Sequence, residues 1–468
     1  MRGQGPPDDG TGARQLTTAA AAAAAGFWLC AAGFCLHNVR SPRSPAVRLS
    51  RPSTYFCAFL TLLNDRLGES IVFPLLPFLL AGISRDARTL GLLTGTYALS
   101  QFAFTPLIGA LSDRYGRRPV IAICVAGSVL GLSLFALTIS LPWCSRFPVA
   151  NAEGWPLALL FVARIIDGVS GGTAATATAV LADISPPEKR ARAFGLVGVA
   201  FGLGFVLGPF LGGVLAERNL SLPVLVAVAV AVLNLVLVLA LLPETLPPQS
   251  RLPMPRKREL QPFHQLGRVF SNPRIRRLAA AFFLFFLAFS AFTGVLVLFL
   301  QQTFGWGPGL TSTAFLVVGV VAMVVQGGLI GPLVKRFGEQ RLTAAGIGFV
   351  IAGCLLIPLA TAATARAQVF SAVALLAAGT GLVTPCLRSL VSRRLADSGQ
   401  GAALGSLQGL QSLGSFLGPP LAGLAYEGVG RTSPFWLAIL LLAGVMTLIS
   451  GGATPPGTPE NSENNFTG

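Results

Sequence analysis

The stretch GLGFVLGPFLGG, residues 202–213, decides the fold of this chain. It places Gly204, Gly208, Pro209, Gly212 and Gly213 inside an apolar segment long enough to cross a bilayer. In a soluble helix these residues are costly, because proline removes a backbone hydrogen bond and glycine adds entropy to the unfolded chain. In a membrane, glycines let two helices approach closely, and neighbouring helices tolerate the proline kink. The stretch therefore predicts a closely packed transmembrane helix.

The composition also indicates a membrane protein. The 468 residues are 53% hydrophobic and only 11% charged, whereas soluble domains have about 25% charged residues. The net charge of +16 does not predict nucleic-acid binding, because the basic residues lie in short loops between apolar runs, where they set topology and contact anionic lipids. The sequence has neither a phosphate-binding P-loop nor a C-x-x-C pair, so we expect neither an enzyme nor a metal site.

Apolar windows of about 20 residues recur from Thr54 onward, as a hydrocarbon core about 30 Å thick requires. They predict twelve spans, near residues 54–82, 90–111, 119–140, 155–182, 193–216, 221–242, 278–301, 311–334, 342–363, 367–391, 402–426 and 434–451.

Basic residues are concentrated in alternate loops, which the positive-inside rule places in the cytoplasm. The predicted spans and the changes in composition between them divide the chain into five parts. We expect a disordered or targeting extension, a first six-helix bundle, a cytoplasmic linker, a second six-helix bundle and a disordered tail, at residues 1–52, 53–242, 243–277, 278–451 and 452–468.

An internal repeat supports the two bundles. GALSDRYG (109–116) aligns with GPLVKRFG (331–338), an offset of 331 − 109 = 222 residues. The Gly204 to Pro209 motif aligns with a second copy that contains Gly418 and Pro419, an offset of 419 − 209 = 210 residues. Two matches in the same order indicate a parallel duplication, as in carriers whose halves rock around a central site.

The first span contains Asp65, Arg66 and Glu69 between apolar segments. A charge at membrane depth costs at least about 2.5–3.5 kcal/mol, so such residues usually face an aqueous cavity or a partner. Asp65 and Glu69 share one helix face, and neighbouring carboxylates favour a proton carrier because each makes the other bind a proton more readily. Arg66 leaves a second interpretation open, a permanently paired ion cluster.

The fourth span contributes Arg164 and Asp167 in FVARIIDGVSGGTAA (161–175). Counted from opposite membrane faces, Arg164 lies at a depth comparable with Glu69. We therefore expect Asp65, Glu69, Arg164 and Asp167 to form one cluster for proton coupling and for the charge of the substrate.

The loop GALSDRYGRRP (109–119) is a candidate gate. Its glycines and charges, at the cytoplasmic end of the second span, predict an ion-pair network that holds one conformation; they are Gly109, Asp113, Arg114, Gly116, Arg117 and Arg118. Positive-inside retention alone would not need this spacing. The second copy has Lys335 in place of the acid, followed by Arg336, and predicts a weaker or differently paired network.

Other polar residues leave alternatives open. Gln408 and Gln411, three residues apart on the eleventh span, either line a cavity or join two helices. Arg388 is expected to extend to the membrane surface. Pro243 and Glu244, in LLPETLPP (241–248), are interpreted as a helix stop without a transport role.

These motifs resemble those of the major facilitator superfamily. GLGFVLGPFLGG is similar to the antiporter motif of its fifth helix, GALSDRYGRRP to the loop after its second helix, and FVARIIDGVSGGTAA to a fourth-helix motif. The spacing of Asp65, Gly68, Pro74 and Pro77 is similar to the first-helix motif of drug–proton antiporters. Residues 54–450 most resemble the twelve-helix drug–proton antiporters close to the tetracycline-efflux group.

The resemblance implies an all-α integral membrane protein of twelve helices in two pseudo-symmetric bundles. It implies proton-coupled export of a small amphipathic compound by alternating access from a bacterial inner membrane, or from an organelle envelope if residues 1–52 are a transit segment. The expected partners are a substrate, protons and the bilayer; we expect a monomer, no cofactor and the proton gradient as energy source. Two alternatives remain: a uniporter or importer of a metabolite such as a sugar or organic acid, and a non-transporting sensor or scaffold.

Overall fold

The computed structural model describes residues 51–140, 154–185, 190–251, 275–394 and 400–450, except residues 82 and 85, together with positions 253, 267, 270 and 271. Residues 1–50, most of the predicted linker and the predicted tail lie outside the described residues.

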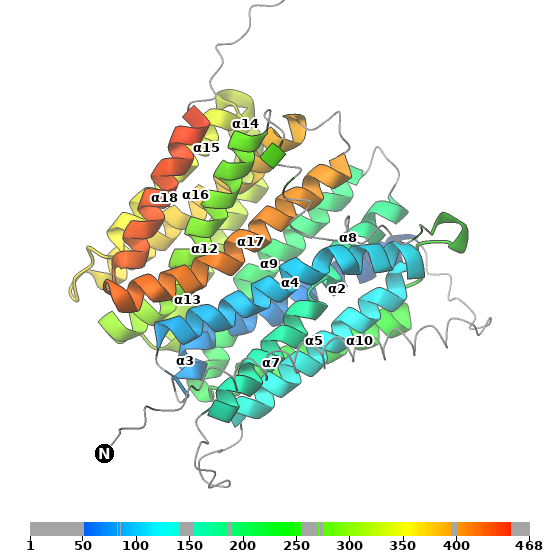
Figure 1. Cartoon of the computed structure of the whole chain (residues 1–468), viewed down its shortest axis with the longest axis horizontal. Coiled ribbons are helices and arrows are strands. Elements are labelled where there is room, and N and C mark those ends of the chain that lie inside the picture. Colours follow the sequence, from blue (N-terminus) through cyan, green and yellow to red (C-terminus); the bar gives the residue numbers. More distant parts are fainter. Residues whose placement is uncertain are drawn as a thin grey trace, which may run out of the picture.

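The first half of the chain forms six spans (Figure 1). They are α2 (Arg51–Val72) continued by η1 (Phe73–Leu75) and α3 (Leu76–Leu80), α4 (Ala87–Tyr115), α5 (Arg117–Ser140), α7 (Gly154–Ser170) continued by α8 (Thr173–Ile184), α9 (Arg190–Arg218) and α10 (Leu222–Leu241). A short turn, η3 (Pro248–Ser250), follows the sixth span.

The second half repeats this arrangement. Its spans are α12 (Arg276–Phe304), α13 (Pro308–Val324) continued by the π-helical turn η4 (Val325–Leu329) and α14 (Ile330–Phe337), α15 (Glu339–Leu356), α16 (Ala365–Arg394), α17 (Gln400–Gly428) and α18 (Ser433–Ser450). The twelve predicted spans are confirmed. In the described part of the chain, eight of these helical segments are long and apolar enough to cross a membrane by length and composition alone.

The breaks between helices follow from local sequence. Only Gly116 separates α4 from α5, and its φ of 110° is a backbone conformation that side chains disfavour. In the second half Gly338, with a φ of 78°, separates α14 from α15 in the same way. Pro74 lies in the turn η1, where α2 passes into α3.

Each half contains an equivalent hydrogen bond between two of its closely packed helices. Ser70 Oγ on α2 donates to the Gly204 carbonyl on α9 at 2.8 Å, and Ser290 Oγ on α12 donates to the Gly414 carbonyl on α17, also at 2.8 Å. Ser70 and Ser290 are 290 − 70 = 220 residues apart, close to the offsets of the sequence repeat. The pseudo-symmetry therefore extends to individual atoms.

Gly204, Gly208 and Gly212 of α9 lie where this helix approaches α2. Gly208 faces Ser70, and a Cβ added at Gly212 would come within 2.7 Å of the Ile71 carbonyl oxygen. Pro209 is buried within the helix. On α17, Gly418 faces Ser290 in the same manner. Small residues are required here because helix association in lipid depends on close packing rather than on a hydrophobic driving force.

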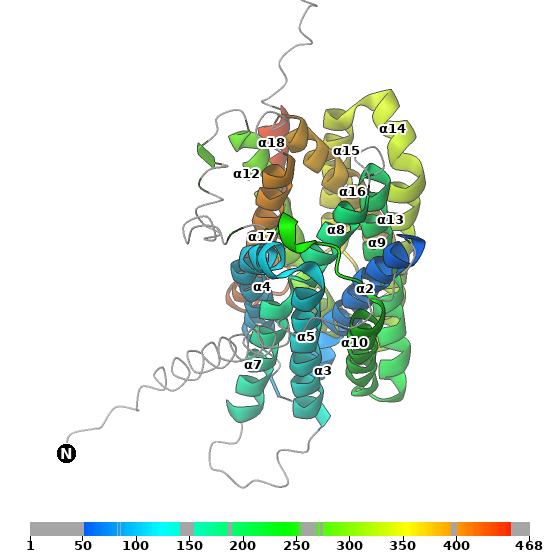
Figure 2. The same ribbon diagram turned by 90° about the vertical axis from the view of Figure 1, so that its right-hand side faces the viewer.

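The two halves meet through two helix pairs, α4 with α17 and α9 with α13 (Figures 1 and 2). Glycine contacts between the halves occur at Gly91 and Gly423 in the first pair and at Gly213 and Gly319 in the second. The contacts at Gly91, Gly423 and Gly213 lie toward the helix ends opposite the basic loops, and we call them the outer interface; Gly319 meets Val206 nearer the middle of α9. The structure thus has the halves closed against each other on that side.

Two alanine substitutions on α9 test this packing. Gly212→Ala forces α9 away from Ile71, and we expect a loss of about 1–3 kcal/mol, the usual cost of overpacking. Gly202 is the matched control on the same helix, because no atom lies within 4 Å of a Cβ built there. Gly202→Ala should leave stability unchanged or raise it slightly. Thermal unfolding in detergent measures both, and equal unfolding temperatures would contradict the close contact.

Candidate functional site

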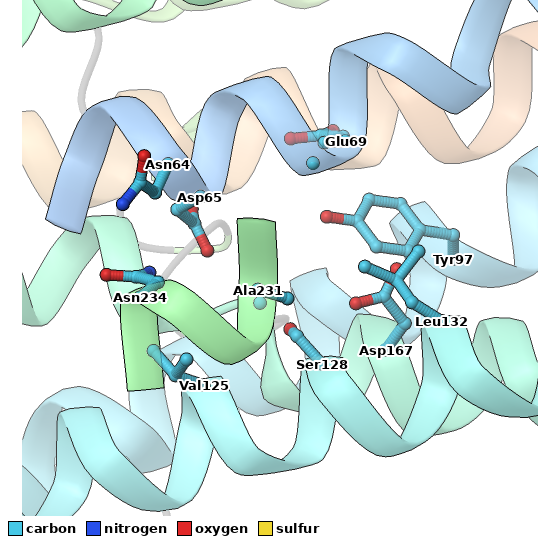
Figure 3. Close-up of a pocket in the computed structure, with 12 residues that line it drawn as sticks. Asn64, Asp65, Glu69, Tyr97, Val125, Ser128, Leu132, Asp167, Ala231 and Asn234 are labelled. Carbon is cyan, nitrogen blue, oxygen red and sulfur yellow. The ribbon is translucent and has the colours of Figure 1, made fainter. Parts of the chain in front are cut away.

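A pocket lies within the first half, between α2, α4, α5, α10 and the region of α7 (Figure 3). Three of the four residues predicted to form the cluster, Asp65, Glu69 and Asp167, line it. Its other lining residues are Asn64, Gly68, Tyr97, Val125, Ser128, Leu132, Gly171, Ala231 and Asn234. Acids that are distant in sequence therefore share one polar pocket inside an apolar bundle.

Arg66 joins two of these acids. Its Nη2 lies 2.6 Å from Asp65 Oδ2, its Nε donates to the same oxygen at 3.2 Å, and its Nη1 contacts Glu69 Oε2. Arg66 and Asp65 are nearly buried, whereas the side chain of Glu69 is 32% exposed. The planar guanidinium fork suits this bridging geometry, because it presents several donors at once. Glu69 is thus the member of the trio that water reaches most easily.

The fourth span supplies a second and looser ion pair. Arg164 Nη1 lies 3.9 Å from Asp167 Oδ2, and both residues are buried. The guanidinium carbon of Arg164 lies 4.7 Å from the centre of the Phe135 ring and 5.9 Å from that of Tyr97. Arg164 Nε and Nη2 are buried and find no hydrogen-bond partner among the described residues. Such donors are unusual in folded proteins, because an unpaired buried donor costs about 1–3 kcal/mol.

The charges of the cluster do not cancel. With every group ionised, the three carboxylates of Asp65, Glu69 and Asp167 face the two guanidinium groups of Arg66 and Arg164, so 3 − 2 = 1 negative charge is left over. A single uncompensated charge within a membrane bundle is unfavourable. One bound proton or one cationic group would neutralise it.

The predicted gating loop forms an ion-pair network centred on Arg117. Arg117 Nη1 lies 2.5 Å from Asp113 Oδ1 and donates to Ser112 Oγ at 2.6 Å, and its Nε lies 3.0 Å from Asp183 Oδ2 at the end of α8. The network joins α4, α5 and α8, all in the first half. Asp183 was not predicted as a member, because the sequence does not reveal that α8 ends beside α5.

Glu244 was also missed as part of this network. Its carboxylate accepts from the backbone N–H of Arg117 at 2.9 Å and from that of Arg118 at 3.2 Å, so it caps the start of α5. A Cβ at Gly116 would collide with the same carboxylate. Interpreting this segment only as a helix stop was therefore incomplete. The available signal was topological, because the ends of the second and sixth spans lie on the same membrane face.

The remaining loop residues differ in their surroundings. Arg118 Nη2 donates to the Leu239 carbonyl at 2.6 Å, and Arg114 is exposed. No atom lies within 4 Å of a Cβ built at Gly109, so packing does not explain that glycine. In the second copy Lys335 and Arg336 are exposed, and the guanidinium carbon of Arg336 lies 5.4 Å from the centre of the Phe337 ring.

In the second half, Arg388 Nη2 on α16 donates to Gln411 Oε1 on α17 at 2.6 Å. Gln411 therefore joins two helices, one of the two roles left open for it. Arg388 bonds to a neighbouring helix rather than extending to the membrane surface as expected. The side chain of Gln408 lies outside the described residues.

Comparison with known proteins supplies the family. The model of the Major Facilitator Superfamily matches residues 55–419. The tetracycline resistance protein, class C, of Escherichia coli is 34% identical over 387 residues, which cover 82% of this chain and 91% of that protein. Multidrug resistance protein 2 of Bacillus subtilis is 27% identical and covers 86% and 92% of the two chains.

Solved structures agree with the fold. The human organic anion transporter MFSD10 (TETRAN) is 26% identical with a TM-score of 0.64, covering 86% of this chain and all of that one. A D-xylose–proton symporter matches with a TM-score of 0.65 over 85% of this chain and 96% of its own length. Its identity of 15% supports a likeness of fold alone.

Arg66→Gln tests whether the bridging guanidinium holds the pocket together. Asp65 and Glu69 would lose their shared cation, and removing one partner of a buried ion pair costs about 3–5 kcal/mol. We expect a lower thermal unfolding temperature in detergent and less monodisperse protein. Arg114→Gln, at an exposed position of the same charge, is the control. Equal stability of the two variants would contradict a structural role for Arg66.

Glu244→Ala tests the cap on α5. Loss of a helix cap costs about 0.5–2 kcal/mol, so the first turn of α5 should open more often. Hydrogen–deuterium exchange of a peptide covering residues 112–121 should become faster, whereas Glu244→Gln, which keeps an acceptor oxygen, should exchange nearly like the parent. Unchanged exchange in the alanine variant would remove Glu244 from the network.

Proposed function

Because the chain belongs to the major facilitator superfamily, we propose that it exports small amphipathic compounds in exchange for protons. The protein is a transporter rather than an enzyme, and it crosses the inner membrane several times. What extends this proposal beyond the family is the single uncompensated negative charge of the Asp65, Glu69 and Asp167 cluster.

The charge balance supports exchange. An apolar bundle disfavours the extra negative charge, so the cluster favours binding of one positive charge. A proton and a cationic group of the substrate would compete for the same excess charge, because either one alone neutralises it. Binding of the substrate would then release the proton, and protonation would release the substrate. Competition of this kind is a simple physical basis for antiport.

Arg164 supports a role for movement in this exchange. Arg164 and Asp167 lie on the same helix, so their 3.9 Å separation and the two unpaired donors of Arg164 allow a closer ion pair to form when the side chains change rotamer as the surrounding helices shift. A closer pair would stabilise ionised Asp167 and favour loss of its proton. The alternating conformations would then differ in proton affinity, as coupling to a gradient requires.

The names of the relatives support the substrate class. Several are tetracycline resistance proteins of bacteria, one is a multidrug resistance protein, and the MFSD10 structure is titled an organic anion transporter. We accordingly propose compounds of drug-like size with an apolar body and at least one polar or charged group.

Transport by purified protein in proteoliposomes tests the proposal. A pH-sensitive dye inside the vesicles reports proton movement while tetracycline, or a panel of cationic, neutral and anionic amphipathic dyes, is added outside. We expect each transported compound to move protons in the opposite direction. Flux without proton movement would show a uniporter instead, and absence of flux for every compound would favour a sensor or scaffold.

Asp65→Asn tests the role of the excess charge. It reduces the cluster to two carboxylates and two guanidinium groups, so neither a proton nor a cation is required for neutrality. We expect uphill accumulation driven by a pH gradient to be lost, whereas exchange of labelled for unlabelled substrate should persist.

The control is Asp86→Asn, which removes an exposed carboxylate but keeps a side chain able to cap α4. It should leave uphill transport intact. Uphill transport by Asp65→Asn at the parent rate would remove Asp65 from proton coupling.

A further inference from the structure

The ends of α9 and α17 at the outer interface carry matching sequences. LGGVLAE (211–217) and LAGLAYE (421–427) are related by the repeat offset of 427 − 217 = 210 residues. The burial classes of positions 211–219 and 421–429 agree one by one, from exposed Leu211 and Leu421 onward. Each segment ends in an exposed glutamate, Glu217 in the first half and Glu427 in the second.

Glu427 contacts the first half. Its Oε1 accepts from the backbone N–H of Ala87, the first residue of α4, at 3.0 Å. One turn earlier on α17, Gly423 packs against the backbone of Ala87 and Arg88. Asp86, the residue that precedes α4, accepts from a different amide, the N–H of Arg88 at 3.1 Å. Glu427 therefore satisfies a helix-terminal amide that the cap of α4 itself leaves free.

Glu217 makes the reciprocal approach. Its carboxylate lies against Gly309 in the first turn of α13, close enough that a Cβ at Gly309 would lie 3.2 Å from Glu217 Cγ and would overlap the carboxylate itself. One turn earlier on α9, Gly213 packs against the Pro308 carbonyl, at 3.0 Å from a Cβ built there. Gly309 is 309 − 87 = 222 residues after Ala87, the offset of the GALSDRYG repeat. The two contacts therefore occupy equivalent positions of the repeat; that of Glu427 is a hydrogen bond and that of Glu217 is a packing contact.

The start of α13 has no side-chain cap of its own. Its N-cap is Gly307, which makes no capping hydrogen bond, and its first residue is Pro308, which has no N–H. The following amides carry the partial positive charge of a helix N-terminus, and a carboxylate beside them is stabilising.

We propose that Glu217 and Glu427, the outer carboxylate pair, lock the outer interface closed. Each half contributes one carboxylate to a helix N-terminus of the other half, so the halves hold each other reciprocally. Both carboxylates are exposed, so water replaces each contact as the halves separate. The lock is therefore strong enough to favour the closed state and weak enough to open in every cycle.

The expected effect is a change in the closed-to-open ratio. A carboxylate at an exposed helix N-terminus stabilises by about 0.3–1 kcal/mol, so two contacts together correspond to a shift of about 3- to 30-fold in that ratio. Each single variant should shift it by roughly the square root of this factor, if the two contacts act independently.

Distance measurements between spin labels test the lock without any substrate. The labels are attached to Trp155→Cys and Leu359→Cys in a protein whose native cysteines are replaced. Both positions are exposed, and they lie at the outer ends of the first and second halves. In Glu217→Ala/Glu427→Ala we expect the population with longer distances to grow relative to the parent. The readout needs no transport, so it stands or falls separately from the proposed function.

Two further variants make the result decisive. Arg218→Gln/Arg366→Gln removes two exposed charges at the same membrane face, and it should leave the distances unchanged. Glu217→Gln/Glu427→Gln keeps acceptor oxygens and should open the interface less than the alanine pair. If the alanine pair does not fold, the glutamine pair replaces it in the distance measurement. Identical distances in parent, alanine and glutamine variants would overturn the lock, as would an equal opening in the arginine variant.

Discussion

The close approach of helix backbones is the constraint on which the rest of this structure depends. In a bilayer, apolar side chains gain little by leaving lipid for a neighbouring helix, so association depends on packing and on hydrogen bonds. Ser70 and Ser290 each donate to a glycine carbonyl at 2.8 Å, and Gly208 and Gly418 leave room for that approach. Larger residues at these glycines would separate α2 from α9 and α12 from α17. α2 also lines the pocket, and α9 and α17 each pack against a helix of the opposite half, so both features depend on this packing.

The same packing makes the charged pocket possible. Buried charges are tolerated in a membrane when they are paired, and the fork of Arg66 pairs two acids at once. Arg164 is held more loosely, 3.9 Å from the carboxylate of Asp167 and beside two aromatic rings. The ion pairs of Arg66 are therefore tight, whereas two guanidinium nitrogens of Arg164 have no hydrogen-bond partner in the part of the chain that the structure describes. Because of this contrast, Arg164 can change its ion pairing more easily than Arg66 when the surrounding helices move.

The features that could be predicted from the sequence are those that depend on membrane thickness and on the periodicity of apolar residues. The twelve spans follow from apolar length, and the shared pocket of Asp65, Glu69 and Asp167 follows from their depth. The bridging by Arg66 stayed open because it depends on which rotamer the side chain adopts. Glu244 and Asp183 were missed because their partners lie 127 and 66 residues away from them, on helices whose neighbours the sequence does not specify. Arg388 was misjudged for the same reason, since Gln411 is 23 residues further along.

One unbroken helix connects the two ends of the first half. α4 begins at Ala87, beside Glu427 of the opposite half, and ends at Tyr115, two residues after Asp113 of the arginine network. Its 29 residues span about 43 Å, so a tilt of about 10° displaces one end relative to the other by about 7 Å. When a helix of this length tilts as one body, a small rotation at one membrane surface becomes a larger displacement at the other. Mechanical linkage of the two surfaces therefore needs no relay of intermediate residues.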